Sequence, residues 1–101
     1  EKNVPDHGMV FIEIDTVLVK GKSVGSKLYW PIPKIHYDNN LDLRIALTNF
    51  SRGLMLYYNG DWESAHQIFA KNPLTLAEVF KERTLGRRPE KWDGTWIMTS
   101  K

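Results

Sequence analysis

Between residues 9 and 30, hydrophobic and polar side chains follow the period of β-strands. Residues 9–19 are rich in β-branched side chains, and in their middle the even positions are apolar while Glu13 and Asp15 stand at odd positions. Because successive side chains of a strand point to opposite faces, this pattern predicts one buried face and one solvated face that carries both acids. The buried row ends at Lys20.

A stretch rich in glycine and serine, residues 21–26, indicates a loop that reverses the chain. Residues 27–30, KLYW, then resume a strand-like composition. Pro31 and Pro33 end this second strand, because proline has no amide hydrogen to donate to a sheet. We therefore predict a β-hairpin, followed by a linker over residues 33–40.

Beyond the predicted linker the hydrophobic period becomes helical. Asn39 or Asn40 can cap a first helix, and Asp61 can cap a second. Pro73 favours the start of a third helix, which runs to about Thr84. The positions that we expect on the inner faces are Leu41, Ile45, Leu47, Phe50, Leu54, Tyr57 or Tyr58, Trp62, Ala65, Ile68, Phe69, Leu76, Val79 and Phe80.

The C-terminal tail combines a turn signal, Asp93-Gly94, with aromatic and β-branched residues. It predicts a short extended segment that Trp92 and Trp96 anchor. The one cluster of basic residues in the chain consists of Arg83, Arg87, Arg88 and Lys91, and we expect the last three to be solvated. The predicted fold class is α+β, with an N-terminal β-hairpin followed by about three α-helices and a short extended C-terminal tail.

The composition of the chain excludes several classes of protein. A chain of 101 residues holds one small domain, and its lack of cysteine excludes a disulfide scaffold, a thiolate zinc site and a cysteine nucleophile. A formal charge of +2 gives no argument for nucleic-acid binding. No apolar run approaches the ~18 residues of a membrane span. Because the first residue is Glu1 rather than methionine, we expect either processing or a segment cut from a longer protein.

Two parts of the chain resemble class III nucleotide cyclases. Residues 14–23, IDTVLVKGKS, followed by Leu28-Tyr29, look like the hairpin that closes the catalytic domain of that family. Residues 57–69 contain Y-x-x-G-D-W-x-x-A-x-x-x-F, which is similar to the helical extension that follows this domain in many bacterial members. The ending, WDGTW and the final TSK at residues 99–101, is also similar.

The resemblance implies a parent enzyme that converts ATP, or else GTP, into the cyclic 3′,5′-monophosphate and pyrophosphate. Two Mg²⁺ or Mn²⁺ ions would act at the interface of a homodimer. The lysine that contacts the triphosphate in this family corresponds to Lys20, which makes it the candidate catalytic residue, and Lys22 is a secondary phosphate contact. The metal-binding aspartates of the family lie upstream of the hairpin, so this segment alone would bind no metal and would be inactive.

On this interpretation residues 1–34 are the terminal hairpin of a cyclase catalytic domain, and residues 35–101 are a helical extension with an aromatic tail. The partners are ATP and the rest of the catalytic domain, with no nucleic acid and no direct membrane contact. The segment is cytoplasmic, and the parent can be anchored in a membrane through upstream regions. The alternative is a non-enzymatic protein-interaction module built on a tetratricopeptide-like helical hairpin.

Overall fold

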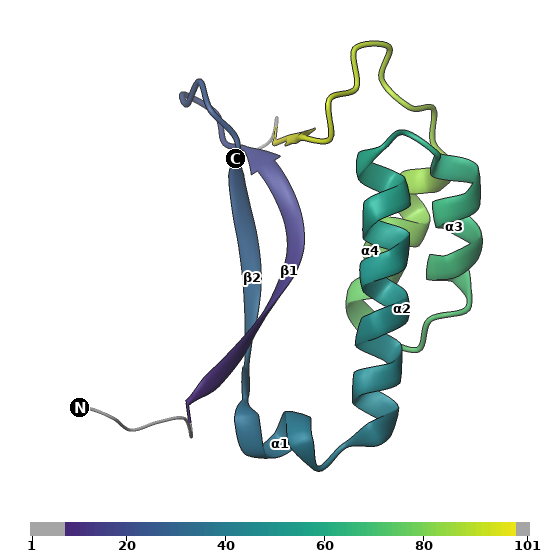
Figure 1. The fold of residues 1–101 in the computed structure, drawn as a ribbon. Coiled ribbons are helices and arrows are strands. Elements are labelled where there is room, and N and C mark those ends of the chain that lie inside the picture. Colours follow the sequence, from purple (N-terminus) through teal and green to yellow (C-terminus); the bar gives the residue numbers. More distant parts are fainter. Residues whose placement is uncertain (1–7, 99–101) are drawn as a thin grey trace.

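A computed structural model describes residues 8–98 of the chain (Figure 1). The final TSK at residues 99–101, which belongs to the cyclase resemblance, lies outside the described residues. The elements in order are β1 (Met9–Leu18), β2 (Ser26–Pro33), α1 (Lys34–Asp38), α2 (Leu41–Tyr58), α3 (Trp62–Ala70), α4 (Thr75–Leu85) and β3 (Trp96–Ile97). This order confirms the predicted α+β class with its hairpin, helices and extended tail.

The strands and the helices form two layers. In Figure 1 the hairpin stands beside α2, α3 and α4, and α1 joins the layers at one end. The tail that follows α4 crosses back to the hairpin, where β3 pairs in parallel with the end of β1. The strand order is therefore β2-β1-β3, with β1 in the centre.

An irregularity in β1 changes which side chains face the helices. The antiparallel pairing with β2 loses its regular register between Glu13 and Asp15. A bulge of this kind interrupts the alternation of side chains along a strand. Asp15 is consequently 5% exposed and Val17 is 3% exposed. The prediction that Glu13 and Asp15 share a solvated face is wrong for Asp15, and Glu13 is half-buried.

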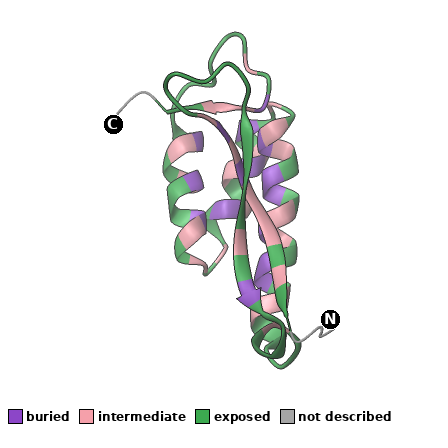
Figure 2. Ribbon diagram, turned by 90° about the vertical axis from the view of Figure 1, so that its left-hand side faces the viewer, coloured by how far each residue is buried: buried purple, intermediate pink, exposed green. Residues whose placement is uncertain are grey.

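The helices pack around a cluster of aromatic side chains. Phe50 lies with its ring centroid 5.4 Å from both Phe69 and Phe80. α2 and α3 approach so closely that a Cβ atom added at Gly53 would lie 2.9 Å from the Phe69 ring, so this position requires glycine. Figure 2, which looks onto the hairpin, shows the buried positions on the helices behind it.

Three predicted inner positions are exposed, namely Leu41, Ile45 and Val79. Leu41 and Ile45 belong to the first turns of α2, which extend past the ends of α3 and α4 (Figure 1). A helical period alone does not show how far the neighbouring helices reach. No helix within residues 8–98 is long and apolar enough to cross a membrane.

Two of the predicted helix caps are confirmed, and the predicted linker is corrected. Asn40 accepts a hydrogen bond of 3.0 Å from the backbone nitrogen of Leu43, and Asp61 caps α3 in the same way. Residues 33–40 contain the short helix α1 instead of an irregular linker. An ion pair of 2.6 Å between Lys34 and Asp38, one helical turn apart, favours this helix.

Candidate functional site

Lys20 and Lys22 lie in the turn that follows β1. The backbone nitrogen of Lys22 donates to the carbonyl oxygen of Val19 at 3.0 Å, and Gly21 between the lysines has a φ of 91°. A left-handed residue at this position of a turn favours glycine. Both lysine side chains are exposed, and within residues 8–98 neither forms an ion pair. Their ammonium groups can therefore reach a ligand that approaches the end of the hairpin.

The end of β1 just before Lys20 has neighbours on both edges. Val17 pairs with Ser26 of β2 and with Trp96 of β3. The backbone nitrogen of Met98 donates to the carbonyl oxygen of Leu18 at 2.9 Å. The tail thus closes the edge of β1 that β2 leaves open, and it holds the strand directly before Lys20.

A buried ion pair joins β1 to α4 below this strand end. An Arg83 Nη atom donates to Asp15 Oδ2 at 2.9 Å, and these side chains are 12% and 7% exposed. The same nitrogen donates to the Tyr57 hydroxyl at 3.0 Å, and the guanidinium lies 4.1 Å from the centre of the Trp96 ring. Asp15 also accepts from the backbone nitrogen of Thr16. We call Asp15, Tyr57, Arg83 and Trp96 the Asp15–Arg83 cluster.

Burial dominates the electrostatics of the cluster. It raises the pKa of the Asp15 carboxyl above its ordinary value, although the hydrogen bond and the positive charge of Arg83 act in the opposite direction. Burial also raises the pKa of the Tyr57 hydroxyl to about 12. Arg83 is bonded to both Asp15 and Tyr57 and lies against the Trp96 ring, so the cluster ties four parts of the chain together: β1, α2, α4 and β3.

Replacing Tyr57 by phenylalanine is expected to make the free energy of unfolding fall less steeply at alkaline pH. Between the ordinary pKa of 10.0 and about 12, Tyr57 keeps its proton in the folded protein and loses it in the unfolded chain. The free energy of unfolding of the wild type therefore falls as the pH rises through this range. Urea denaturation at several pH values should give a shallower fall for Tyr57→Phe. The same slope in Tyr57→Phe and in the exposed control Tyr29→Phe would contradict this expectation.

A second polar link connects β1 to α2. Thr16 Oγ1 donates to the Tyr58 hydroxyl at 3.0 Å, and this hydroxyl donates to Glu13 at 2.9 Å. Glu13 also pairs with Lys27 of β2 at 3.0 Å. Burial raises the pKa of Tyr58, so the hydroxyl remains a donor. Glu13 and Asp15 are thus both engaged by side chains of this protein.

The donors within residues 8–98 do not fit the Mg²⁺ or Mn²⁺ site that the cyclase resemblance implies for the parent. Among the residues that the structure describes, no three histidine, aspartate or glutamate side chains form a group that could hold a metal ion. The carboxylates of Glu13 and Asp15, which precede the candidate site on β1, have the protein partners described above. We assign no chemical step of this chain to a metal.

The aromatic anchors predicted in the tail are confirmed. Trp92 Nε1 donates to the carbonyl oxygens of Tyr57 and Tyr58 at 2.9 and 3.0 Å, and its ring centroid lies 5.2 Å from that of Trp62. Gly94 has a φ of 94° and lies against the backbone of Tyr58. The tail is therefore fixed to the end of α2 before it reaches β1. As expected, Arg87, Arg88 and Lys91 are exposed.

Sequence reasoning missed the role of Arg83. It grouped this arginine with its basic neighbours, although Arg83 follows Phe80 by three positions and so lies near the inner face of α4. That spacing was the available signal.

Comparisons of the chain with protein-family models, with curated proteins and with solved structures find no match.

Proposed function

We propose that this chain is the C-terminal segment of a class III nucleotide cyclase, in which Lys20 contacts the triphosphate of ATP. The observation that carries the proposal is the location of Lys20, which extends an exposed side chain from the turn directly after a central strand that is held on both edges. Cyclisation builds negative charge on phosphate oxygens, and a cation on a rigid element stabilises this charge with little reorganisation. The motif VKGK of residues 19–22 supports the same role.

The helical half braces the hairpin in this proposal. The Asp15–Arg83 cluster, the Tyr58 hydroxyl and the strand β3 all contact β1 within a few residues of Lys20. Lys22 is a secondary phosphate contact, because its backbone closes the turn while its side chain remains exposed. The helical extension therefore holds the hairpin in position and keeps it rigid, and the hairpin supplies the positive charges of Lys20 and Lys22.

The remaining parts of the enzyme belong, on this proposal, to residues that precede the hairpin. These parts are the ligands of Mg²⁺ or Mn²⁺, the groups that select adenine or guanine, and the surface that forms the homodimer. The segment lies in the cytoplasm, where ATP is available. The 101-residue chain is inactive on its own.

The test is an assay of the longer protein that contains the residues encoded before Glu1. With ATP and Mn²⁺ it should form cyclic AMP and pyrophosphate, and GTP should be tried in parallel. The 101-residue chain alone should form neither product. If the longer protein folds, binds no nucleotide and forms no cyclic product, the cyclase proposal is wrong.

A further inference from the structure

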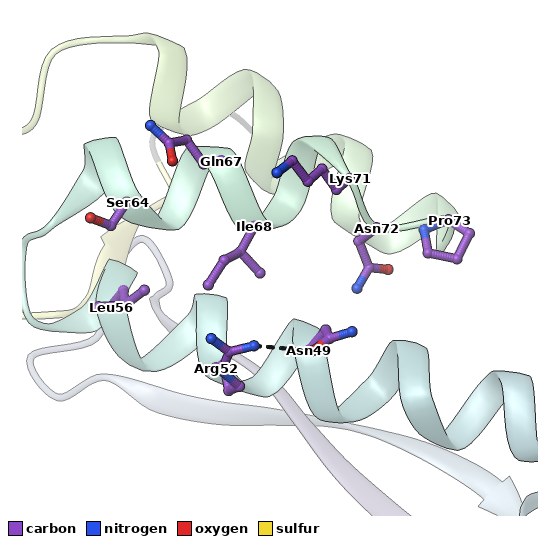
Figure 3. Close-up of a pocket in the computed structure, with 9 residues that line it drawn as sticks. All are labelled: Asn49, Arg52, Leu56, Ser64, Gln67, Ile68, Lys71, Asn72 and Pro73. Atoms are coloured by element: carbon purple, nitrogen blue, oxygen red, sulfur yellow. Dashed lines mark hydrogen bonds between the residues drawn. The ribbon is translucent and has the colours of Figure 1, made fainter.

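A groove runs between α2 and α3 on the surface of the helical layer (Figure 3). Its volume is about 530 Å³. Figure 3 shows Ile68 reaching from α3 toward α2, where Asn49 and Arg52 lie beside each other. The residues that line this α2–α3 groove are Asn49, Arg52, Leu56, Ser64, Gln67, Ile68, Lys71, Asn72 and Pro73.

The charge of the α2–α3 groove is entirely positive. Arg52 stands on α2 and Lys71 follows the last residue of α3, and no acidic residue lines the groove. Within residues 8–98 neither cation has an ion-pair partner. The hydrogen bond of Arg52 goes to the neutral Asn49 side chain at 3.2 Å. Two cations that line one groove without a counter-charge favour an anionic ligand.

The floor of the groove is apolar and its walls carry amides. Leu56 and Ile68 are half-buried, so each offers part of its side chain to a ligand. Asn72 is already engaged, because it donates to the carbonyl oxygen of Ala46 at 2.9 Å and accepts from the backbone of Leu74. Gln67 and Asn49 retain amide hydrogens for a ligand. This combination fits an extended peptide that carries both acidic and apolar side chains.

A second hollow continues this surface along α2. It shares Asn49 with the groove, and its other lining residues are Leu41, Arg44, Ile45 and Thr48. The Nε atom of Arg44 is buried and has no hydrogen-bond partner. Arg44 adds a third cation to this surface. Leu41 and Ile45 are exposed, so the mixture of cations and apolar side chains extends over the N-terminal turns of α2.

We propose that the α2–α3 groove binds an acidic peptide segment of a partner protein. The carboxylates pair with Arg52 and Lys71, and an apolar side chain of the peptide lies on Leu56 and Ile68. Single-stranded nucleic acid fits less well, because no aromatic ring lines the groove to stack a base and the cations are few. The site does not depend on the proposed cyclase activity, since it lies on the helices and contains neither Lys20 nor Lys22.

The test uses the full chain labelled with ¹⁵N and a short capped peptide of alternating glutamate and leucine. Titration at low salt should shift the side-chain amide signals of Asn49 and Gln67 and the Nε–H signal of Arg52. The double variant R52E/K71E should weaken binding at least ~10-fold, because two attractive charges become repulsive. The matched control R87E/K91E changes the net charge equally on exposed residues outside the groove and should bind like the wild type.

Three results would overturn the proposal. The first is equal loss of affinity in both double variants, which would indicate attraction by net charge alone. The second is equal binding of a peptide in which glutamine replaces glutamate. The third is tighter binding of another ligand than of the acidic peptide. This ligand could be a single-stranded oligonucleotide, or a second copy of this chain detected by sedimentation. Circular dichroism of both double variants should show the wild-type helix content, because Arg52 and Lys71 are exposed.

Discussion

Replacement of Arg83 by methionine is expected to lower the free energy of unfolding by about 3–5 kcal/mol, because removal of one partner leaves the other as an unpaired buried charge. Asp15 would keep only the backbone hydrogen bond from Thr16. The Trp96 ring would lose the guanidinium that lies 4.1 Å above it, and the Tyr57 hydroxyl would lose its donor. Methionine retains the apolar stem of arginine, so the expected loss reflects the charge and its hydrogen bonds.

Urea denaturation at neutral pH measures this effect. The matched control is Arg87→Met, which removes an exposed arginine just beyond the end of α4 and should change stability by less than about 0.5 kcal/mol. Adding Asp15→Asn to Arg83→Met should restore part of the stability, because the double variant buries no unpaired charge. Equal stability of Arg83→Met and Arg87→Met would contradict the view that the Asp15–Arg83 cluster stabilises the contact between the layers.

Features that depend on a few neighbouring residues could be predicted from the sequence. Asn40 and Asp61 cap their helices because a cap needs only a side-chain oxygen and a backbone nitrogen a few positions away. Trp92 was a predictable anchor, since a large aromatic side chain beside a turn must bury its ring somewhere. The reversal of the chain after the first strand was predictable from its glycines, and Lys20 lies in this turn, two residues beyond the end of β1.

Features that depend on distant pairing could not be predicted. The irregularity between Glu13 and Asp15 arises from the register of β1 against β2, which no pattern within β1 reveals. Without this irregularity, the alternation of side chains along β1 predicts that Asp15 is exposed to solvent. Arg83, 68 positions away, could be recognised as its partner only after the hairpin and α4 were placed side by side. The linker prediction failed because a single turn of helix leaves almost no periodic signal.

Replacement of Lys20 by alanine in the longer protein is expected to lower the rate of cyclisation by about 10²-fold, as loss of a charged contact to the transition state does. Stability should change by less than about 0.5 kcal/mol, because the side chain is exposed and makes no ion pair within the described chain. Lys22→Ala should cause a smaller loss of rate. Lys91→Ala, which removes an exposed lysine after α4, should leave the rate unchanged.

The direct measurement is the single-turnover rate of cyclic AMP formation by wild-type and Lys20→Ala forms of the longer protein at saturating ATP. Thermal unfolding of both proteins should be recorded on the same samples. Our account predicts a rate about 10²-fold lower in Lys20→Ala at an unchanged unfolding temperature. A rate for Lys20→Ala that equals that of the wild type and of Lys91→Ala would contradict the assignment of Lys20 to the triphosphate.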